Sequence, residues 1–149
     1  MSFTGEYTNS LDQKNRLSVP AKYRKSLDAS NDKTFVICKG FDLNLLLYPV
    51  EEWKIVEQQL ISLSSIRDTH RNFIRNIVRH ANYVRYDSQG RIAIPDILLK
   101  YSSINKDVLV IGMLKKIELW DPLTLEKFES NNGSLDGEDF EGLADKISF

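Results

Sequence analysis

Residues 12–20 of the chain read DQKNRLSVP, and residues 87–95 read DSQGRIAIP. Aspartate, arginine and proline recur at the same three positions, with apolar residues at matching places between the arginine and the proline. A second block, FVICKGFDLNLLLYP at residues 35–49, matches VLVIGMLKKIELWDP at residues 108–122 in a glycine, a leucine and an aromatic residue. Two matched blocks in the same order indicate that the chain is a tandem duplication.

Each Asp-x-x-x-Arg motif is expected at a hairpin turn between two strands. The β-prone segments EYTNSL and NYVRY precede the two motifs, and the alternating segments LSVP and IAIP follow them. A helix would also bring the aspartate and the arginine together at i and i+4. Gly90 and the flanking β-branched residues argue against that helix. Asn15 and Gly90 hold equivalent positions, and both residue types tolerate the positive φ that such a turn needs.

The remainder of each copy predicts a short helix and then two apolar strands. Pro20 and Pro95 precede helix-compatible runs, and proline is well tolerated at the first helical position. Between the copies we expect two helices, and a shorter helix, LTLEKF, should end the second copy. The first of the two should bury Trp53, Val56, Leu60 and Leu63, and the second should turn Phe73, Ile74, Ile77 and Val78 inward.

These segments predict an α+β fold that is mainly β. We expect a first repeat at residues 1–54, a helical connector at 55–80, a second repeat at 81–128 and an acidic tail at 129–149. Within that tail, Asn131, Asn132, Gly133 and Ser134 predict a polar break.

Composition sets limits on the class of protein. The 149 residues are 42% hydrophobic and 28% charged, as in ordinary globular proteins. No apolar run approaches the ~20 residues of a membrane span, and the opening MSFTGEYTNS is unlike a signal peptide, so we expect a cytoplasmic protein. The single cysteine, Cys38, excludes an internal disulfide and a cysteine-rich zinc site.

The net charge of −1 conceals an uneven distribution. Residues 126–149 carry a net charge of −5, and residues 1–125 carry +4. The first 27 residues hold five basic side chains against two acidic ones. Such asymmetry points to a basic working surface with an acidic tail.

No pattern of catalytic or metal-binding residues accompanies the repeats. The sequence lacks a Ser/His/Asp grouping, a glycine-rich phosphate loop and a Cys/His cluster. His70 and His80 are ten residues apart, so they cannot share a metal ion from one helix face. Asp12 and Asp87 each have an arginine partner that keeps the carboxylate ionised, which disfavours a hydrolase. We expect no enzyme activity, no cofactor, no metal and no small-molecule substrate.

Two interpretations of the motif remain open at the level of single residues. The aspartate–arginine pair can simply stiffen a surface hairpin, with little net stabilisation. Alternatively, a two-stranded ribbon fits the major groove of DNA, where its arginines reach base edges or phosphates. Repetition of the motif beside other basic residues favours the second interpretation.

The doubled motif resembles the paired motifs of the MraZ family. Other stretches that resemble this family are GEYTNSLD near the start, Tyr48-Pro49 with Trp53, and Arg71-Asn-Phe73-Ile-Arg75 leading to Ala81, so that the resemblance spans residues 3–128. It implies tandem, pseudo-symmetric AbrB-like swapped-hairpin half-barrels with connecting helices. It also implies a bacterial, nucleoid-associated transcriptional regulator that represses its own cell-division and cell-wall gene cluster by binding repeated operator boxes in double-stranded DNA as a ring-shaped homo-oligomer.

This interpretation assigns roles to individual residues. Asp12 and Asp87 structure the turns, and the expected DNA-binding residues are Lys14, Asn15, Arg16, Lys22, Gln89, Gly90 and Arg91. The second copy has Ser88-Gln89-Gly90 where the first has Gln13-Lys14-Asn15, so we expect the two turns to contact DNA differently.

A second group of arginines, spaced by four, belongs to the expected helix between the copies: Arg67, Arg71, Arg75 and Arg79. They could follow phosphates or pair with acids of another subunit. The family resemblance favours an oligomer interface for Arg71 and Arg75.

An alternative class of function is an antitoxin-like interaction module. The acidic segment 136–145, with nearby Phe140, Leu143, Ile147 and Phe149, could fold on a partner's basic groove. It could instead dock on a neighbouring subunit or screen the DNA-binding surface.

Overall fold

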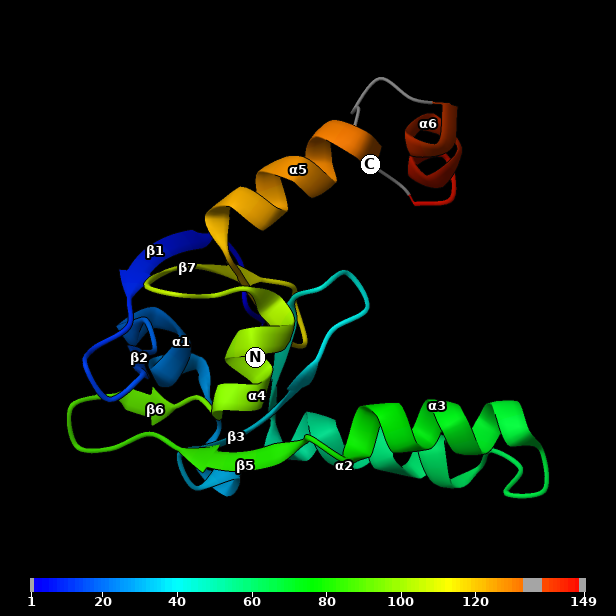
Figure 1. Cartoon of the computed structure of the whole chain (residues 1–149), viewed down its shortest axis with the longest axis horizontal. Coiled ribbons are helices and arrows are strands. Elements are labelled where there is room, and N and C mark those ends of the chain that lie inside the picture. Colours follow the sequence, from blue (N-terminus) through cyan, green and yellow to red (C-terminus); the bar gives the residue numbers. More distant parts are fainter. Residues whose placement is uncertain (1, 133–137, 148–149) are drawn as a thin grey trace.

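The computed structural model describes residues 2–132 and 138–147 of the chain, and Figure 1 shows their arrangement. The fold is α+β and consists mainly of antiparallel strands, as the sequence predicts. The first repeat contains β1 (Glu6–Ser10), β2 (Arg16–Ser18), α1 (Ala21–Ser26), β3 (Thr34–Lys39), β4 (Leu45–Pro49) and α2 (Val50–Ile61). A 3-10 turn, η1 (Ala29–Asn31), precedes β3, and α3 (Asp68–Val78) follows α2.

The second repeat has the same order of elements. It contains β5 (Asn82–Arg85), β6 (Arg91–Ala93), α4 (Asp96–Ser102), β7 (Asp107–Gly112), β8 (Ile117–Trp120) and α5 (Pro122–Asn132). A short helix, α6 (Glu138–Ala144), lies in the acidic tail. The expected boundary between residues 54 and 55 falls inside α2, and the boundary between 128 and 129 falls inside α5.

The two repeats are interleaved in space. The large sheet has the order β1-β7-β8-β4-β3-β5, so each repeat places its first strand at the edge formed by the other. The ribbon of β2 and β6 also joins the repeats, with Leu17 opposite Ile92. At the sheet centre, β4 pairs with β8, with Leu46 opposite Glu118. These registers relate equivalent residues by an approximate two-fold axis.

The hairpin expectation for the motifs is therefore wrong in one respect. The turns exist, but the strands flanking each turn pair with strands of the other repeat rather than with each other. The physical reason is burial, because pairing β2 with β6 places Leu17 and Ile92, both 0% exposed, in one shared core. A separate hairpin in each repeat would leave this apolar surface without a partner.

Both repeats contribute side chains to the main core. The fully buried members include Phe3, Tyr23, Phe35, Ile37, Leu45, Leu47, Leu98, Ile117 and Leu119. The phenol of Tyr23 donates to the backbone oxygens of Thr4 and Gly5, which satisfies the one polar atom of that buried ring. Pro20 and Pro95 occupy the N-cap positions of α1 and α4 rather than the predicted first helical positions, so each helix begins one residue later than expected.

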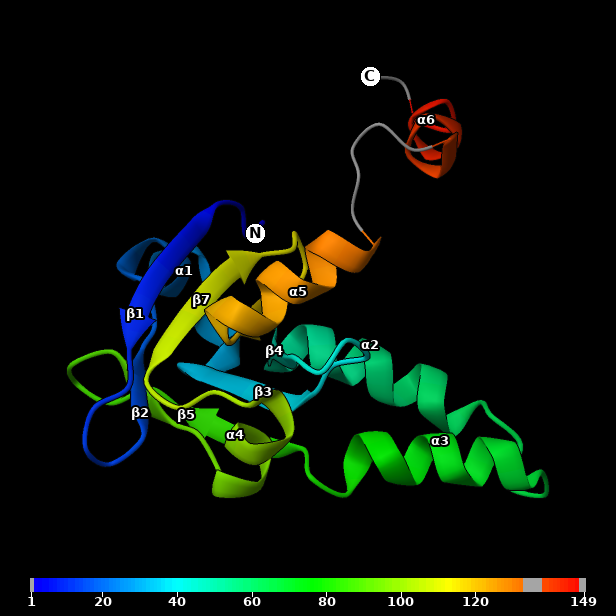
Figure 2. The same ribbon diagram turned by 45° about the horizontal axis from the view of Figure 1, so that its top comes forward.

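A second apolar cluster lies between the β3–β4 face and the α2–α3 pair, which projects from the sheet as one arm (Figure 2). Trp53 and Leu60 of α2 are buried there, and Val56 and Leu63 pack against them, as predicted. The chain's cysteine, Cys38, is part of this cluster, and burial raises the pKa of its thiol to about 12.

The prediction for α3 is correct for one side of the helix only. Ile77 is buried and Ile74 packs on the cluster, but Phe73 and Val78 are about two-fifths exposed, at 41% and 42%. Because α3 lies alongside α2 in an arm that projects from the sheet (Figure 2), only part of its surface meets other apolar side chains.

Near the C-terminus, the ring of Phe128 on α5 lies 5.5 Å from that of Trp120. Asn131 and Asn132 belong to α5, so the predicted polar break does not occur at these two residues, and Gly133 and Ser134 lie outside the described residues. Within residues 2–132 and 138–147, no helix has the length and apolar character to cross a membrane.

The interleaved topology predicts that neither repeat folds alone. Residues 1–80 and 81–149, made as separate polypeptides, would each retain a single internal strand pair, β3–β4 or β7–β8. Because an isolated two-stranded hairpin is at best marginally stable in water, each half should lack a cooperative thermal transition by circular dichroism. The mixed halves should regain one. A cooperative melt for either half by itself would contradict the shared core.

Candidate nucleic-acid interface

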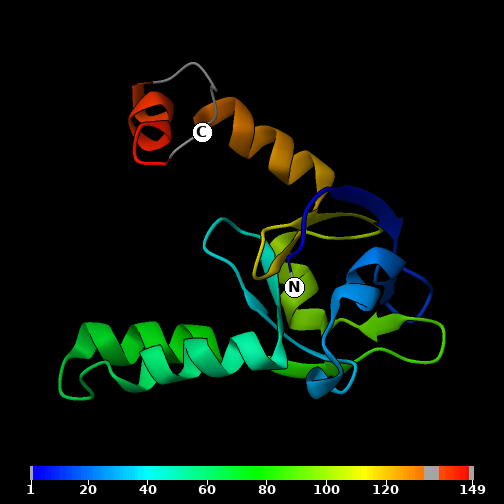
Figure 3. The same cartoon turned by 180° about the vertical axis from the view of Figure 1, so that it is seen from behind.

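The two Asp-x-x-x-Arg motifs form two turns at one end of the molecule, opposite the α2–α3 arm (Figures 1 and 3). In the first turn, the backbone N–H of Asp12 donates to the carbonyl of Arg16, and that of Asn15 donates to the carbonyl of Asp12, both at 3.0 Å. Asn15 has a φ of 56°, in the left-handed region. The predicted turn and its positive-φ position are therefore confirmed.

The Asp12 carboxylate organises the first turn from within. Its Oδ1 accepts the backbone N–H groups of Lys14 and Arg16, both at 2.9 Å, and its Oδ2 accepts from Nε of Arg16 at 2.8 Å. A short carboxylate that accepts its neighbours' backbone donors is the usual reason for aspartate at such a position.

The second turn repeats this arrangement. Asp87 accepts the backbone N–H groups of Gln89 at 2.9 Å and Arg91 at 3.0 Å, and Nε of Arg91 at 3.0 Å. Gly90 has a φ of 79° and corresponds to Asn15. Each arginine is thus fixed by the aspartate four residues before it, and the turn-structuring role is consistent with the contacts of both aspartates.

Hydrogen bonding sets the protonation of both carboxyl groups. The backbone N–H of Arg16 is the main factor that lowers the pKa of Asp12, partial desolvation opposes it, and the Arg16 side chain and Lys14 N–H add to the lowering. The backbone N–H of Arg91 is likewise the main factor that lowers the pKa of Asp87. Both turns therefore present a carboxylate that stays ionised and keeps its arginine in place.

The ribbon of β2 and β6 joins the two turns into one surface. Beyond the strands, the N–H of Val19 donates to the carbonyl of Gly90 at 2.9 Å, and that of Ile94 donates to Asn15 at 3.1 Å. Nη1 of Arg91 also lies 3.6 Å from Oδ2 of Asp12, which links the turns through their side chains. Among the described residues no ion pair joins Arg16 to Asp87, so the linkage is asymmetric.

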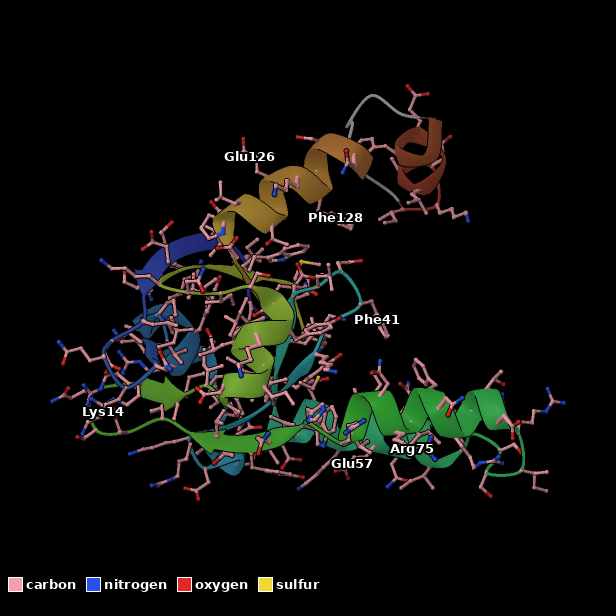
Figure 4. All side chains as sticks on the ribbon, viewed as in Figure 1. Lys14, Phe41, Glu57, Arg75, Glu126 and Phe128 are labelled. Carbon is pink, nitrogen blue, oxygen red and sulfur yellow. The ribbon has the colours of Figure 1, made fainter. Side chains whose placement is uncertain are left out.

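The other predicted DNA-binding residues occupy different parts of this surface. Lys14 and Gln89 are exposed at the tips of the turns, and Figure 4 shows Lys14 at the outer edge of the molecule. Asn15 is half-buried, and its amide lies 3.4 Å from Oδ1 of Asp96 on α4. Lys22 lies on α1, where its ammonium is 3.5 Å from the Thr4 hydroxyl rather than on a turn.

Sequence reasoning did not assign a site role to Arg24, which contacts the second turn. Its Nε donates to the carbonyl of Val19 at 3.0 Å, and its guanidinium lies 5.8 Å from the centre of the Tyr86 ring. A Cβ on Gly90 would lie 2.6 Å from that guanidinium carbon, so a side chain at position 90 would displace Arg24. Gly90 is buried, unlike the half-buried Asn15 of the first turn, and the Arg24 side chain lies against it.

Each turn thus rests on a helix of the opposite repeat, through Asp96 of α4 for the first turn and Arg24 of α1 for the second. The basic composition of the first 27 residues includes Arg24, but no local pattern distinguishes it from its neighbours Lys22 and Lys25. Its role depends on the pairing of β2 with β6, which brings α1 to the second turn.

The arginines of α3 lie at the other end of the chain's body. Arg71 donates to the carbonyls of Ser65 and Ile66 and pairs with Asp68, so it closes the α2–α3 loop. Nη1 of Arg75 donates to the Asn72 amide oxygen at 2.8 Å. Both side chains are exposed, and an intersubunit role for them stays a prediction.

The histidines of the helical arm are not close partners in one site. Nδ1 of His70 accepts the backbone N–H of Ser64 at 3.0 Å, and His80 lies beyond the end of α3. Across residues 2–132 and 138–147, histidine, cysteine and acidic side chains form no group of three that could hold a metal ion.

Comparisons with known proteins cover almost the whole chain. A family model described as "MraZ protein, putative antitoxin-like" matches residues 2–76 and again residues 77–141. The chain is 40% identical over 146 residues to a Clostridium tetani protein named Transcriptional regulator MraZ, with 98% of this chain and 96% of that protein covered. A protein of the same name from Clostridium acetobutylicum is 39% identical over 147 residues, with the same coverage. Another from Halothermothrix orenii is 41% identical over 118 residues, covering 79% of this chain and 80% of that protein.

The hydrogen bonds of the first turn predict how its aspartate titrates. In Arg16→Ala, the pKa of Asp12 should rise only partway toward its ordinary value, because the backbone N–H groups of residues 14 and 16 remain. Carboxyl carbon shifts followed by NMR through acid pH measure this, with Asp87 in the same sample as the internal control.

The stabilisation from a lowered pKa is present at neutral pH and is lost as the pH falls through that lowered pKa. Asp12→Asn should therefore reduce the pH dependence of unfolding in acid. An ordinary pKa for Asp12 in the unmodified protein would contradict the geometry of this turn.

Proposed function

Because the chain belongs to the MraZ family, whose curated members are named transcriptional regulators, we propose that it is a regulator that binds specific DNA sequences through its two turns. The observation that carries this proposal is the joining of two Asp-x-x-x-Arg turns by one ribbon, with each arginine held by its aspartate. The major groove, about 12 Å wide, admits a two-stranded ribbon. On this proposal the protein works in the cytoplasm, at the nucleoid.

The two arginines are not equally available to a ligand. Arg16 engages Asp12 through Nε, and within residues 2–132 and 138–147 its terminal nitrogens form no hydrogen bond or ion pair. Arg91 contacts Asp87 through Nε and Asp12 through Nη1. Since a guanidinium reads guanine with two parallel donors, Arg16 is the better placed of the two for base contact. Arg91 then serves mainly to hold the turns together.

The flanking groups suit contact with the DNA backbone. Lys14 at the first tip is an exposed cation, and Gln89 at the second is an exposed neutral hydrogen-bonding group. Contacts of this kind position a protein on the duplex, whereas base-edge contacts provide specificity. We expect the first turn to discriminate sequence more strongly than the second.

The proposal extends to assembly and to the regulated genes. A ring-shaped homo-oligomer would present several copies of the ribbon to repeated operator boxes, and avidity would then exceed the affinity of one copy without new contacts. The exposed arginines Arg71 and Arg75 are candidates for its subunit interface. We expect repression of the protein's own cell-division and cell-wall gene cluster.

The antitoxin-like alternative rests on the tail. Phe140, Leu143 and Ile147 are at least half exposed and are accompanied by acidic residues, as in a segment that folds on a partner. The turns involve both repeats, whereas the tail is a single short helix, so DNA binding remains the preferred function. A pull-down with and without residues 129–149 distinguishes the two, because loss of every protein partner on truncation alone would favour the alternative.

Substitution of Arg16 tests the proposal directly. Arg16→Ala should abolish specific binding to DNA upstream of the protein's own gene, since each lost contact costs about 1–3 kcal/mol and the loss is repeated in every engaged subunit. Arg16→Lys keeps the charge but not the planar fork, so it should bind specific and unrelated DNA with similar affinity. Arg85→Ala, which removes an exposed arginine from β5, is the matched control.

Fluorescence anisotropy at two salt concentrations measures the binding, and light scattering confirms that the assembly is unchanged. Affinity should fall steeply with salt for the unmodified protein. Undiminished operator binding by Arg16→Ala in an intact assembly would refute the assignment.

A further inference from the structure

An apolar groove lies at the end of the molecule away from the turns. A cavity of about 310 Å³ opens between the β3–β4 face and the α2–α3 arm, lined by Cys38, Leu46, Trp53, Val56, Leu60 and Ile77 among others. Phe41 and Phe73 stand at the groove with their rings stacked, 6.1 Å apart and inclined by 11°. Phe41 is nonetheless 72% exposed. Two aromatic rings and an apolar cavity left open to water indicate a surface that accepts an apolar partner.

Two lysines and two glutamates lie beside this groove, and both glutamates already accept hydrogen bonds. Glu118, opposite the lining residue Leu46, accepts the Trp120 indole N–H at 2.9 Å. Lys39 lines the groove, with its ammonium 4.9 Å from the Tyr101 ring, and the ammonium of Lys116 lies 5.7 Å from the ring of Tyr48, another lining residue. Neither lysine pairs with a carboxylate of residues 2–132 or 138–147. The nearby Glu57 already accepts the Trp53 indole N–H at 2.8 Å. The groove therefore favours an occupant that is both apolar and acidic.

The C-terminal helix α6 has this character. Phe140 and Leu143, three residues apart, lie on one face of α6, and Ile147 follows in the turn after the helix; the three side chains are 50%, 61% and 60% exposed. Glu141 on α6 and Asp145 in the turn that follows the helix are also exposed. Neither forms an ion pair within the part of the chain that the structure describes. The tail thus matches the groove in both apolar character and charge.

The arrangement of the elements is compatible with contact within one chain. In Figures 1 and 2, α5 leaves the sheet on the side from which the α2–α3 arm also projects, and the β3–β4 loop lies between them. Figure 4 shows Phe41 on this loop, directed toward the space between α5 and the arm. The turns lie at the opposite end, where Lys14 is labelled.

We propose that residues 138–147 fold back on their own chain and place Phe140, Leu143 and Ile147 in this groove, with Glu141 and Asp145 directed toward Lys39 and Lys116. This contact covers Phe41 and Phe73 and neutralises the two lysines beside the groove. It leaves the two turns free, so the tail is a built-in cover for the groove and not a competitor of DNA. The inference does not depend on the proposed function.

A fluorescent label on the full chain tests this contact. Lys146→Cys provides an exposed thiol for a bimane, whose emission is quenched by a tryptophan that lies close to it. The native Cys38 is buried and its thiol has a raised pKa of about 12, so it should not take up the label, and unmodified protein serves as the check. The emission should be quenched, and Trp53→Phe should restore it severalfold. Trp120→Phe, the matched control, should leave it quenched.

A substitution in the tail provides a second test that does not depend on correct folding of the Trp53→Phe variant. Leu143→Ser changes an exposed residue outside both cores, so it should release the tail, raise the emission severalfold and leave the thermal transition cooperative. Bright emission from the unmodified tail, or no change with Leu143→Ser, would overturn the proposal.

Two further measurements test whether the tail instead binds a second copy of the chain or covers the turns. Labelled Trp53→Phe chains mixed with unlabelled, unmodified chains should stay bright. Quenching in that mixture would mean that the tail enters the groove of a second copy, which overturns the contact within one chain. Operator affinity should be the same with Leu143→Ser. Tighter DNA binding would instead mean that the tail screens the turns, and it would also overturn the proposal while leaving the proposed function intact.

Discussion

The antiparallel pairing of β2 with β6, in which Leu17 lies opposite Ile92, is the contact on which the rest of the structure depends. It buries two strands that are too short to be stable alone, and it brings the two turns to the same end of the molecule. The same exchange sends β1 to the edge beside β7 and β5 to the edge beside β3. A single core therefore serves both repeats, and the position of each turn is determined by residues about 75 positions away.

The charges around the two turns, rather than the net charge of the chain, determine how this surface interacts with a polyanion. A chain with a net charge of −1 is an unpromising ligand for a polyanion. The acidic residues closest to the turns are, however, committed to internal bonds, since Asp12 and Asp87 accept backbone N–H groups and fix the arginines. The five basic residues of the first 27 can then act near a phosphate backbone, while much of the negative charge lies in the tail. Phosphate contacts depend on this local arrangement.

The sequence predicted both turns, the order of elements and the α+β class because each of these features has a local signature. The repeated aspartate, arginine and proline marked the turns, and Asn15 and Gly90 marked their left-handed positions. The local pattern did not predict which strands pair, because short alternating strands such as residues 16–18 and 91–93 carry no information about their partner; only the resemblance to the MraZ family implied that hairpins are exchanged. The hairpin expectation followed sequence proximity, and the burial of Leu17 against Ile92 outweighed it.

The parts of the site that sequence reasoning missed share the same cause. Arg24 lies against Gly90 because the strand exchange places α1 under the second turn, and Asp96 approaches Asn15 for the equivalent reason in α4. Apolar spacing identified the inner face of α2, yet it overestimated the burial of Phe73 and Val78. Apolar periodicity predicts which face of a helix turns inward, but not how much of that face other side chains cover.

Amide hydrogen exchange of the full chain, with and without DNA from upstream of its own gene, tests the central claim most directly. The account predicts slower exchange in residues 12–18 and 87–93 when DNA is bound, with no change in α3. Protection of α3 around Arg71 and Arg75, with both turns exchanging as in the free protein, would contradict it and place the DNA on the helical arm.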